Sequence, residues 1–230
     1  MISKLPRWAW FGSAALAFIA GSINAIGFLG FQHQGVTHLT GNTTLLGIAV
    51  STGDAANALR LAAIVGSFLA GCIFSGFLIQ DSTLKLGRRY GIALIIESLL
   101  LCAAVPFLRR HSSIGDYLAS CACGLQNGMV STYSGAVLRT SHVSGIITDL
   151  GIYFGQTLRG LNVDRRRMQL CLLLLGAFFG GSMGGALGYA YFSYETLYFP
   201  AALTGCVGIA YSLYLHWRRD PARPGPGKIS

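Results

Sequence analysis

Residues 8–31 read WAWFGSAALAFIAGSINAIGFLGF, a run of 24 residues without one charged side chain. A helix of about 20 apolar residues crosses the roughly 30 Å of hydrocarbon in a bilayer. Lys4 and Arg7 precede the run, as they would in a secretory signal, but the apolar part of a signal has only about 7–15 residues. We therefore interpret this stretch as a first membrane helix that is retained.

The rest of the chain repeats this low-charge pattern. Hydrophobic residues make up 53% of the sequence and charged residues 11%, whereas a soluble domain usually carries about 25% charged residues. Counting the first, six stretches are long enough to span a membrane, at about 8–30, 60–80, 89–108, 115–136, 168–191 and 197–216. Two shorter ones, at about 39–52 and 143–158, predict re-entrant half-helices or short spans. The predicted fold class is an all-α membrane protein, a helical bundle of six full spans plus two short helices.

The net charge of +9 comes from short basic clusters between the apolar runs. Such clusters orient membrane helices and contact lipid headgroups. The sequence shows no basic face of the kind that binds nucleic acid, so no nucleic-acid partner is predicted. With six spans, 14 Lys and Arg residues lie inside and 3 outside; with eight spans the division is 13 to 4. Both counts place the two termini in the cytoplasm. We favour six spans, because the same segment is short in both halves, and three spans per half make the halves inverted.

A spaced motif occurs twice in the chain. One copy has Gly21-Ser22-Ile23-Asn24 followed by His38-Leu39-Thr40-Gly41, and the other has Gly124-Leu125-Gln126-Asn127 followed by His142-Val143-Ser144-Gly145. Both copies fit G-x-x-N, a gap of 13 or 14 residues, and H-x-[ST]-G-x-x-T-x-x-G. The pattern predicts a duplicated chain. Repeat one is expected at about 8–108 and repeat two at about 115–216, within one domain at 1–217, before a basic disordered tail at 218–230.

The second part of each motif falls where a short helix is predicted to begin. A helix start in a low-dielectric setting presents free N–H groups and a partial positive charge, which attract an anionic group. Thr40 or Asn42 would cap such a helix, and Gly41 or Gly145 would allow close approach of backbone or ligand. Ordinary helix capping is the alternative interpretation, and both stay open.

Several other polar residues are candidates for contact with a solute. His38 and His142 are predicted to act as proton carriers, since histidine ordinarily titrates near neutral pH; the alternative is that they lie among headgroups or bond to backbone carbonyls. Asn24 and Asn127 either hold two helices together or contact a ligand. The full set of predicted substrate-binding residues is Asn24, His38, Thr40, Gly41, Asn42, Thr43, Gln126, Asn127, Arg139, His142, Ser144, Gly145 and Thr148.

Two acids lie inside apolar segments. A carboxylate there is costly unless it is protonated, paired or in contact with an aqueous cavity. Glu97 stands within the apolar run at 92–107, and Asp149 stands one turn beyond His142–Gly145. Both are predicted to couple transport to a proton or another cation. The alternative is an ion pair with Arg139 or with an arginine at a helix end.

Two common enzyme motifs are absent from the sequence. The chain contains no H-E-x-x-H and no Walker loop. Its six cysteines lie in apolar runs, where cysteine acts as a small hydrophobic residue, and Cys121-x-Cys123 lacks the spacing of a metal pair. The protein is predicted to be no enzyme, and to need no metal and no cofactor.

The two motif copies resemble the YoaK-like family of bacterial multi-pass membrane proteins, domain of unknown function 1275. The residues that carry the resemblance are Gly21, Asn24 and Thr37–Thr43 in the first half, with Gly124–Asn127 and Arg139–Gly145 in the second. The resemblance spans roughly residues 10–216, and Ser144 replaces a threonine that the family tends to have. It implies a protein of the bacterial cytoplasmic membrane with six to eight spans, and it implies no substrate.

From these observations we expect a small secondary transporter or channel-like carrier of an unidentified small solute. Its pathway would lie between the two repeats. The alternative is a membrane module that transports nothing, such as a receptor, an assembly factor or a lipid-binding protein. The expected partners are the lipid bilayer and the solute, and association of copies into a homo-oligomer is left open.

Overall fold

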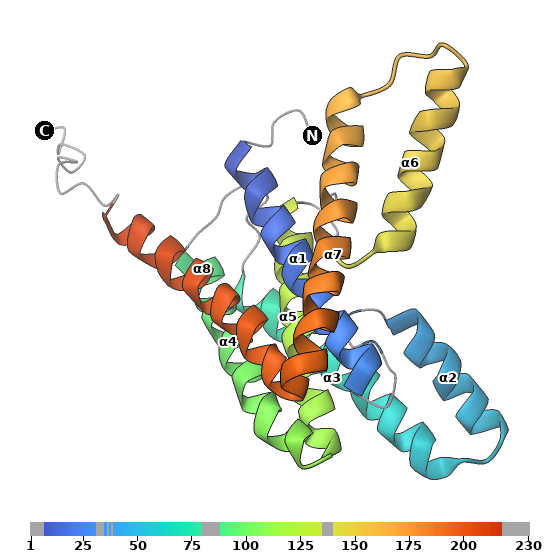
Figure 1. The fold of residues 1–230 in the computed structure, drawn as a ribbon, viewed down its shortest axis with the longest axis vertical. Coiled ribbons are helices and arrows are strands. Elements are labelled where there is room, and N and C mark those ends of the chain that lie inside the picture. Colours follow the sequence, from blue (N-terminus) through green and yellow to red (C-terminus); the bar gives the residue numbers. More distant parts are fainter. Residues whose placement is uncertain are drawn as a thin grey trace, which may run out of the picture.

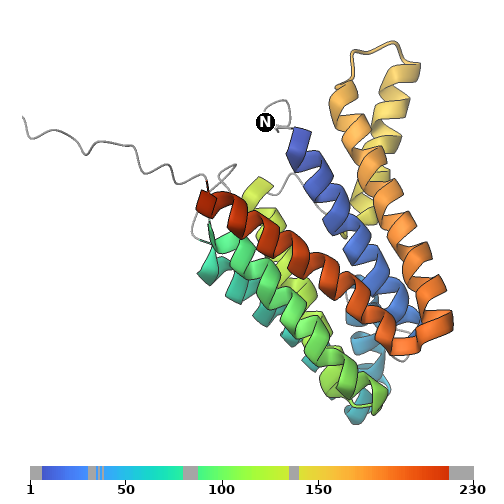
Figure 2. The ribbon, with the colours of Figure 1, turned by 60° about the vertical axis from the view of Figure 1, so that its left-hand side comes forward.

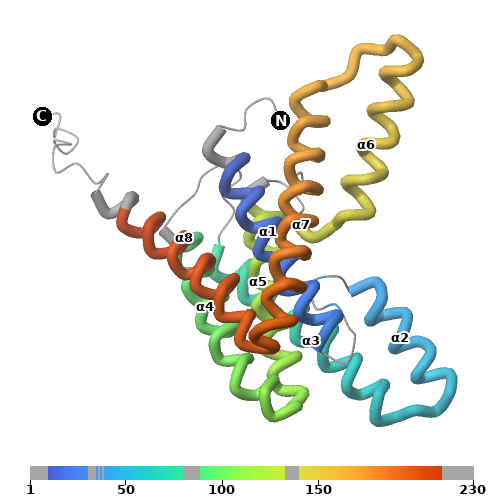
Figure 3. Tube along the Cα trace, viewed as in Figure 1, coloured from blue at the N-terminus to red at the C-terminus, as the bar shows by residue number. Residues whose placement is uncertain are grey.

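A computed structural model describes residues 7–30, 35, 37, 39–79, 88–134 and 140–217. Within these ranges the chain is helical and contains no strand, as the sequence predicts. The helices are α1 (Arg7–Gly30), α2 (Leu39–Ser51), α3 (Ala55–Leu78), α4 (Arg88–Arg109), α5 (Ser113–Ser134), α6 (Val143–Leu158), α7 (Arg165–Phe192) and α8 (Tyr198–Trp217), with the short 3₁₀ helix η2 (Ser193–Leu197) before α8. Figure 1 shows their arrangement, and Figure 3 follows the same path as a tube. The predicted tail lies outside the described residues.

Four segments are long and apolar enough to cross a membrane by length and composition. They are Trp10–Gly30, Ala55–Leu78, Arg89–Arg109 and Arg165–Leu213, the last of which contains both α7 and α8. The prediction of six separate full spans is not confirmed by this criterion. Among the long helices described, α5 does not meet this criterion. It contains polar residues such as Asp116, Gln126 and Asn127, which lower its hydropathy.

Two pairs of helices from opposite halves of the chain run parallel to each other. In α1 and α7, Phe18 lies against Gly181, and Gly30 further along lies against Tyr189. In α3 and α5, the Ser120 hydroxyl donates to the Ile64 carbonyl at 2.8 Å, and Gly128 lies against Ser75. Each of these pairs therefore joins a long helix of one half to a long helix of the other half.

Other pairs of long helices are antiparallel. α4 and α8 are antiparallel, because Gly91 contacts Ser212 while Ser98 contacts Gly205. The last residue of α1, Gly30, lines a small cavity together with Asp116 in the first turn of α5, and α1 and α5 run in opposite directions in Figures 1 and 2. Since α3 is parallel to α5, α1 and α3 also run in opposite directions.

Glycine makes the parallel pairs possible. A β-carbon on Gly21 would overlap the Phe178 carbonyl, and one on Gly124 would overlap the Phe68 carbonyl. Likewise, a β-carbon on Gly181 would overlap the carbonyl of Phe18. Small residues let helix backbones approach closely where no hydrophobic force joins helices in lipid. The glycines at these crossings therefore fix which helices pair.

The buried apolar residues gather in two clusters along the bundle. One includes Leu94, Leu125 and Leu174, and the other includes Ile19, Leu101 and Leu197. Large apolar side chains also point away from the bundle, and the most exposed of them include Phe77 and Phe179. Such exposure suits lipid as the surrounding solvent, since a soluble monomer rarely exposes large apolar surface.

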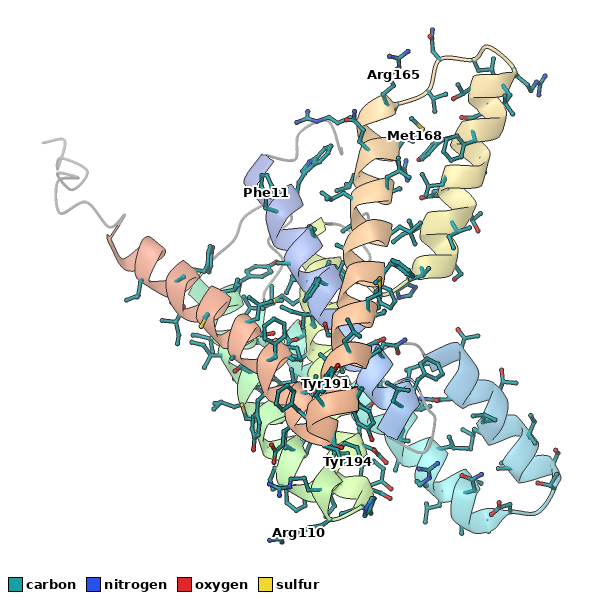
Figure 4. All side chains as sticks on the ribbon, viewed as in Figure 1. Phe11, Arg110, Arg165, Met168, Tyr191 and Tyr194 are labelled. Carbon is teal, nitrogen blue, oxygen red and sulfur yellow. The ribbon has the colours of Figure 1, made fainter. Side chains whose placement is uncertain are left out.

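The two short helices lie at the edge of the molecule. Among the described elements, α2 packs only against α3, and α6 packs only against α7. Both begin near the middle of the molecule and run toward opposite ends of it (Figures 1 and 2). The side chains in Figure 4 mark these ends, with Arg110 and Tyr194 at one and Arg165 at the other.

Candidate functional site

The start of α2 is held to α1 by the first copy of the motif. The Thr37 hydroxyl donates to Asn24 Oδ1 at 2.8 Å, and the Asn42 amide donates to the Gly35 carbonyl at 2.9 Å. Asn24 stands six residues before Gly30, the end of α1, which is about 9 Å at 1.5 Å per residue. The chain therefore turns back along α1 before α2 begins.

The second copy of the motif makes the equivalent contact in the other half. The Ser141 hydroxyl donates to Asn127 Oδ1 at 2.6 Å, and the Asn127 amide donates to the Cys123 carbonyl at 2.9 Å. Asn127 stands seven residues before Ser134, the end of α5, or about 10 Å. This chain also turns back before its short helix begins. We call these two asparagine–hydroxyl pairs, Asn24–Thr37 and Asn127–Ser141, the latches.

Both short helices are shorter than the roughly 30 Å of hydrocarbon in a bilayer. α2 has 13 residues and α6 has 16, which correspond to about 20 Å and 24 Å. The predicted segments, 39–52 and 143–158, agree with these bounds to within a residue. Because each short helix begins at the level of a latch, its N-terminal N–H groups lie near the middle of the length of the bundle rather than at one of its ends.

The predicted capping of α2 differs from the structure. α2 begins at Leu39, so Thr40 and Asn42 lie in its first turn, and Asn42 reaches back to Gly35 instead of capping. In α6, His142 is the N-cap residue, and its side chain makes no capping hydrogen bond. His38 and Arg139 lie outside the described residues.

Most other motif side chains line the outside of the short helices. Thr40, Thr43, Ser144 and Thr148 are exposed. The hydroxyls of Thr43 and Thr148 donate to backbone carbonyls one turn earlier, Leu39 and Ser144. A β-carbon on Gly41 or Gly145 would meet open space, so the expected close approach of backbone at these glycines is absent from the described part of the chain.

Glu97 lies in the middle of α4 and is 1% exposed. Neither of its carboxylate oxygens has a hydrogen-bond partner among the described residues, and the same is true of the Gln126 amide nitrogen in α5. Cys123, one turn before Gln126, has its thiol close to Glu97. An ionised carboxylate here would be unpaired in a low-dielectric core, which is costly.

Asp149 has a different environment from Glu97. Its side chain is 43% exposed, and it pairs with Arg167 of α7 at 3.9 Å. The Arg167 guanidinium also lies over the Tyr153 ring, 5.9 Å from the centroid. The arrangement is the ion pair that the sequence left open as the alternative to ion coupling, and the partner is an arginine at a helix end, Arg167 in the first turn of α7.

We expect Asp149→Asn to change the free energy of unfolding by less than about 1 kcal/mol, because a half-exposed ion pair contributes little. Arg167→Gln should have an equally small effect, apart from its lost contact with the Tyr153 ring. Denaturant titration of the purified protein in detergent measures both. A loss above roughly 2 kcal/mol for Asp149→Asn would show that the pair does more than join α6 to α7.

One polar cluster was not predicted from the sequence. A cavity of about 40 Å³ lies at the end of the bundle that holds the α4–α5 turn, and Gly30, His111, Asp116 and Tyr194 are among the residues that line it. Asp116 pairs with Arg60 at 3.7 Å, and the Tyr194 hydroxyl donates to the Gly30 carbonyl at 2.9 Å. The available signal was an acid and a base, Asp116 and Arg60, each a few residues into a long helix.

These features define the class of protein. Long apolar helices pack through glycine crossings and expose large apolar side chains, as expected of a helical membrane protein. The chain belongs to a family of proteins of unknown function, DUF1275, whose model matches residues 12–210. This match confirms the resemblance seen in the two motif copies. No curated protein and no solved structure matches the chain significantly.

Proposed function

We propose that the protein is a small secondary carrier whose solute path lies at the starts of the two short helices. One observation carries the proposal: α2 and α6 begin near the middle of the molecule and leave it toward opposite ends. Half-helices of this kind line the substrate sites of many secondary transporters, where their N-termini face anionic groups. The solute class that fits is therefore a small anion.

The direction of the long helices supports a bundle of six spans. α1 and α3 are antiparallel, and α2 connects them. If α2 crossed the whole membrane, α1 and α3 would run in the same direction. α2 and α6 are accordingly re-entrant from opposite faces. The distribution of basic residues supports a topology with both termini on the cytoplasmic side of a bacterial inner membrane.

Equivalent contacts in the two halves support an internal repeat. Gly21 meets the carbonyl of Phe178, and Gly124, its counterpart, meets that of Phe68. The Ser182 hydroxyl donates to the Gly21 carbonyl at 3.3 Å, while the Cys72 thiol donates to the Gly124 carbonyl at 3.2 Å. The two latches are a third equivalent pair. Together with the six-span topology, these contacts favour inverted repeats, the architecture that gives alternating access in carriers.

A second function is favoured by the latches themselves. Asn24, Asn42 and Asn127 are all hydrogen-bonded within the chain, and Asn42 and Asn127 are buried. Polar groups that are already paired serve to hold helices, and they leave less capacity for a solute. This arrangement fits a membrane module that transports nothing. The experiment below separates the two functions.

The test is solute-driven current from the protein reconstituted in vesicles, recorded on a solid-supported membrane. The solutes are inorganic phosphate, sulfate and a series of small dicarboxylates, whose divalent anions carry net charge even when one proton moves with them. Gly41→Phe and Gly145→Phe fill open space at the helix starts, so both variants should fold normally but lose at least 90% of the wild-type current. Gly66→Phe, at an open position of α3, is the matched control and should keep the current.

The carrier proposal fails if no solute gives a current with the wild-type protein. It also fails if both blocked variants carry current as the Gly66→Phe control does. Melting temperatures of the four proteins, measured in the same detergent, show whether a lost current reflects lost folding.

A further inference from the structure

Glu97 is isolated from every charge that the neighbouring helices offer. It lies between Leu94 and Leu101 of α4, which belong to the two apolar clusters. Its exposed fraction is 1%, and no ion pair to it exists among the described residues. A buried acid without a partner is seldom kept for stability, because an apolar residue of similar size would pack better.

The elements packed around α4 provide no charged partner for Glu97. α5 contributes the thiol of Cys123 and the unpaired amide of Gln126. α8 places Gly205 and Gly208 against α4 and has no Asp, Glu, His, Lys or Arg between residues 198 and 213. α1 has none between residues 11 and 30. The other two elements that pack against α4 carry one charged side chain each, Arg60 in α3 and Glu195 in η2, and these pair with Asp116 and Arg109. Asp116 stands seven residues before Cys123 in α5, about 10 Å away along the helix.

The surroundings of Glu97 favour a proton over a metal cation. Ca²⁺ needs six to eight oxygen ligands and Mg²⁺ near-octahedral oxygen coordination. The described residues contain no group of three His, Cys, Asp or Glu side chains that would hold a metal, and a thiol is a poor ligand for these hard cations. A proton needs one carboxylate oxygen and no other ligand. The neutral acid is also the form that a dry core tolerates.

We propose that Glu97 is the proton-coupling site of the carrier, so that solute moves together with H⁺. The inference rests on the proposed function. On one side of the cycle, a proton from water forms the O–H bond of the Glu97 carboxyl; on the other side, that bond breaks and the proton returns to water. The carboxylate is tolerated only when water reaches it, so loss of the proton favours a conformation more open than the dry one described here.

Infrared spectroscopy of the protein in lipid vesicles tests the proposal without knowledge of the solute. At neutral pH the wild-type protein should show the carbonyl stretch of a protonated carboxylic acid. Glu97→Gln should remove this band, Glu97→Asp should shift it, and Asp116→Asn should leave it in place. On transfer to D₂O the band should shift faster than the amides of α4 exchange, because a coupling acid must meet water during the cycle.

Two results would overturn the proposal. The first is a band that Glu97→Gln does not change, which would mean that the acid is ionised. The second is a band that stays unshifted in D₂O for as long as the α4 amides stay protonated, which would mean that Glu97 is a static part of the core. Melting temperatures establish that Glu97→Gln and Glu97→Asp fold.

Solute-driven current separates this proposal from the one on which it rests. If the carrier is proton-coupled, lowering the pH on the solute side should raise the wild-type current, and Glu97→Gln should remove that dependence. A current that is independent of pH in both proteins defeats the coupling proposal alone. A wild-type protein that carries no solute, but whose Glu97 band exchanges, defeats the carrier proposal and leaves the proton site intact.

Discussion

Gly124→Ala should destabilise the protein by about 1–3 kcal/mol, although alanine is the better helix former. The added β-carbon would overlap the backbone carbonyl of Phe68 in α3, so α3 and α5 would have to move apart along their shared length. Overpacking of a tight contact costs about this much, and here the atom that must yield belongs to a backbone. Chemical denaturation in mixed detergent micelles measures the change in free energy of unfolding.

The matched control is Gly66→Ala, on α3 itself. A β-carbon there meets nothing within 4 Å, so only helix propensity acts, and it favours alanine by up to about 1 kcal/mol. The two substitutions should therefore change stability in opposite directions. Equal stabilisation by both would contradict the close packing of α3 on α5.

Asn127→Leu should also destabilise the protein, by about 1–3 kcal/mol, because it breaks the second latch. Asn127 is buried, and its removal leaves the Ser141 hydroxyl, which is 1% exposed, without its 2.6 Å hydrogen bond. The cost of an unsatisfied buried polar group is of this size. The first amides of α6 should also exchange hydrogen faster, because the latch fixes the start of that helix.

The double variant Asn127→Leu with Ser141→Ala distinguishes a lost latch from a general loss of packing. Removing both partners leaves no unpaired hydroxyl, so the double variant should be more stable than Asn127→Leu alone. If the two losses simply add, Asn127 and Ser141 do not act as a pair.

The helices follow closely from the sequence. Long apolar runs predict long helices, and the short runs predict α2 and α6 almost to the residue, because polar segments bound them on each side. α3 begins at Ala55, five residues before the predicted start at residue 60. The Asp54 side chain caps it there by accepting a hydrogen bond from the backbone N–H of Asn57 at 3.1 Å. The apolar pattern alone does not reveal that cap.

The partners of the motif residues could not be predicted. Asn24 and Asn127 were expected to hold helices or bind a ligand, and the structure pairs them with Thr37 and Ser141, the residues just before each histidine. A gap of 13 or 14 residues allows the chain either to continue beyond its helix or to turn back along it. Only the three-dimensional path decides between these, since both courses bury the same residues.

The helix pairing was equally beyond a linear pattern. Gly66 and Gly71 stand in one glycine-rich stretch of α3, yet Gly71 meets the carbonyl of Cys121 while Gly66 faces open space. Spacing indicates that small residues form a packing face. Which helix lies on that face depends on the contacts between halves that are far apart in the sequence.

The central claim is that α2 and α6 enter from opposite faces without crossing, and cysteine labelling in sealed membranes tests it most directly. Single cysteines replace Ser3, Gly53, His111 or Gly160 in a protein free of other cysteines, and a membrane-impermeant maleimide is applied from one side at a time. Gly53 and Gly160 are turn residues after α2 and α6, with φ values of 74° and 73°, and His111 lies in the α4–α5 turn. Re-entrant α2 and α6 predict that positions 53 and 111 are labelled from one face and positions 3 and 160 from the other. Labelling of positions 3 and 53 from the same face would mean that α2 crosses the membrane, and labelling of positions 111 and 160 from the same face would mean that α6 does; either result would contradict the half-helices on which the proposed function rests.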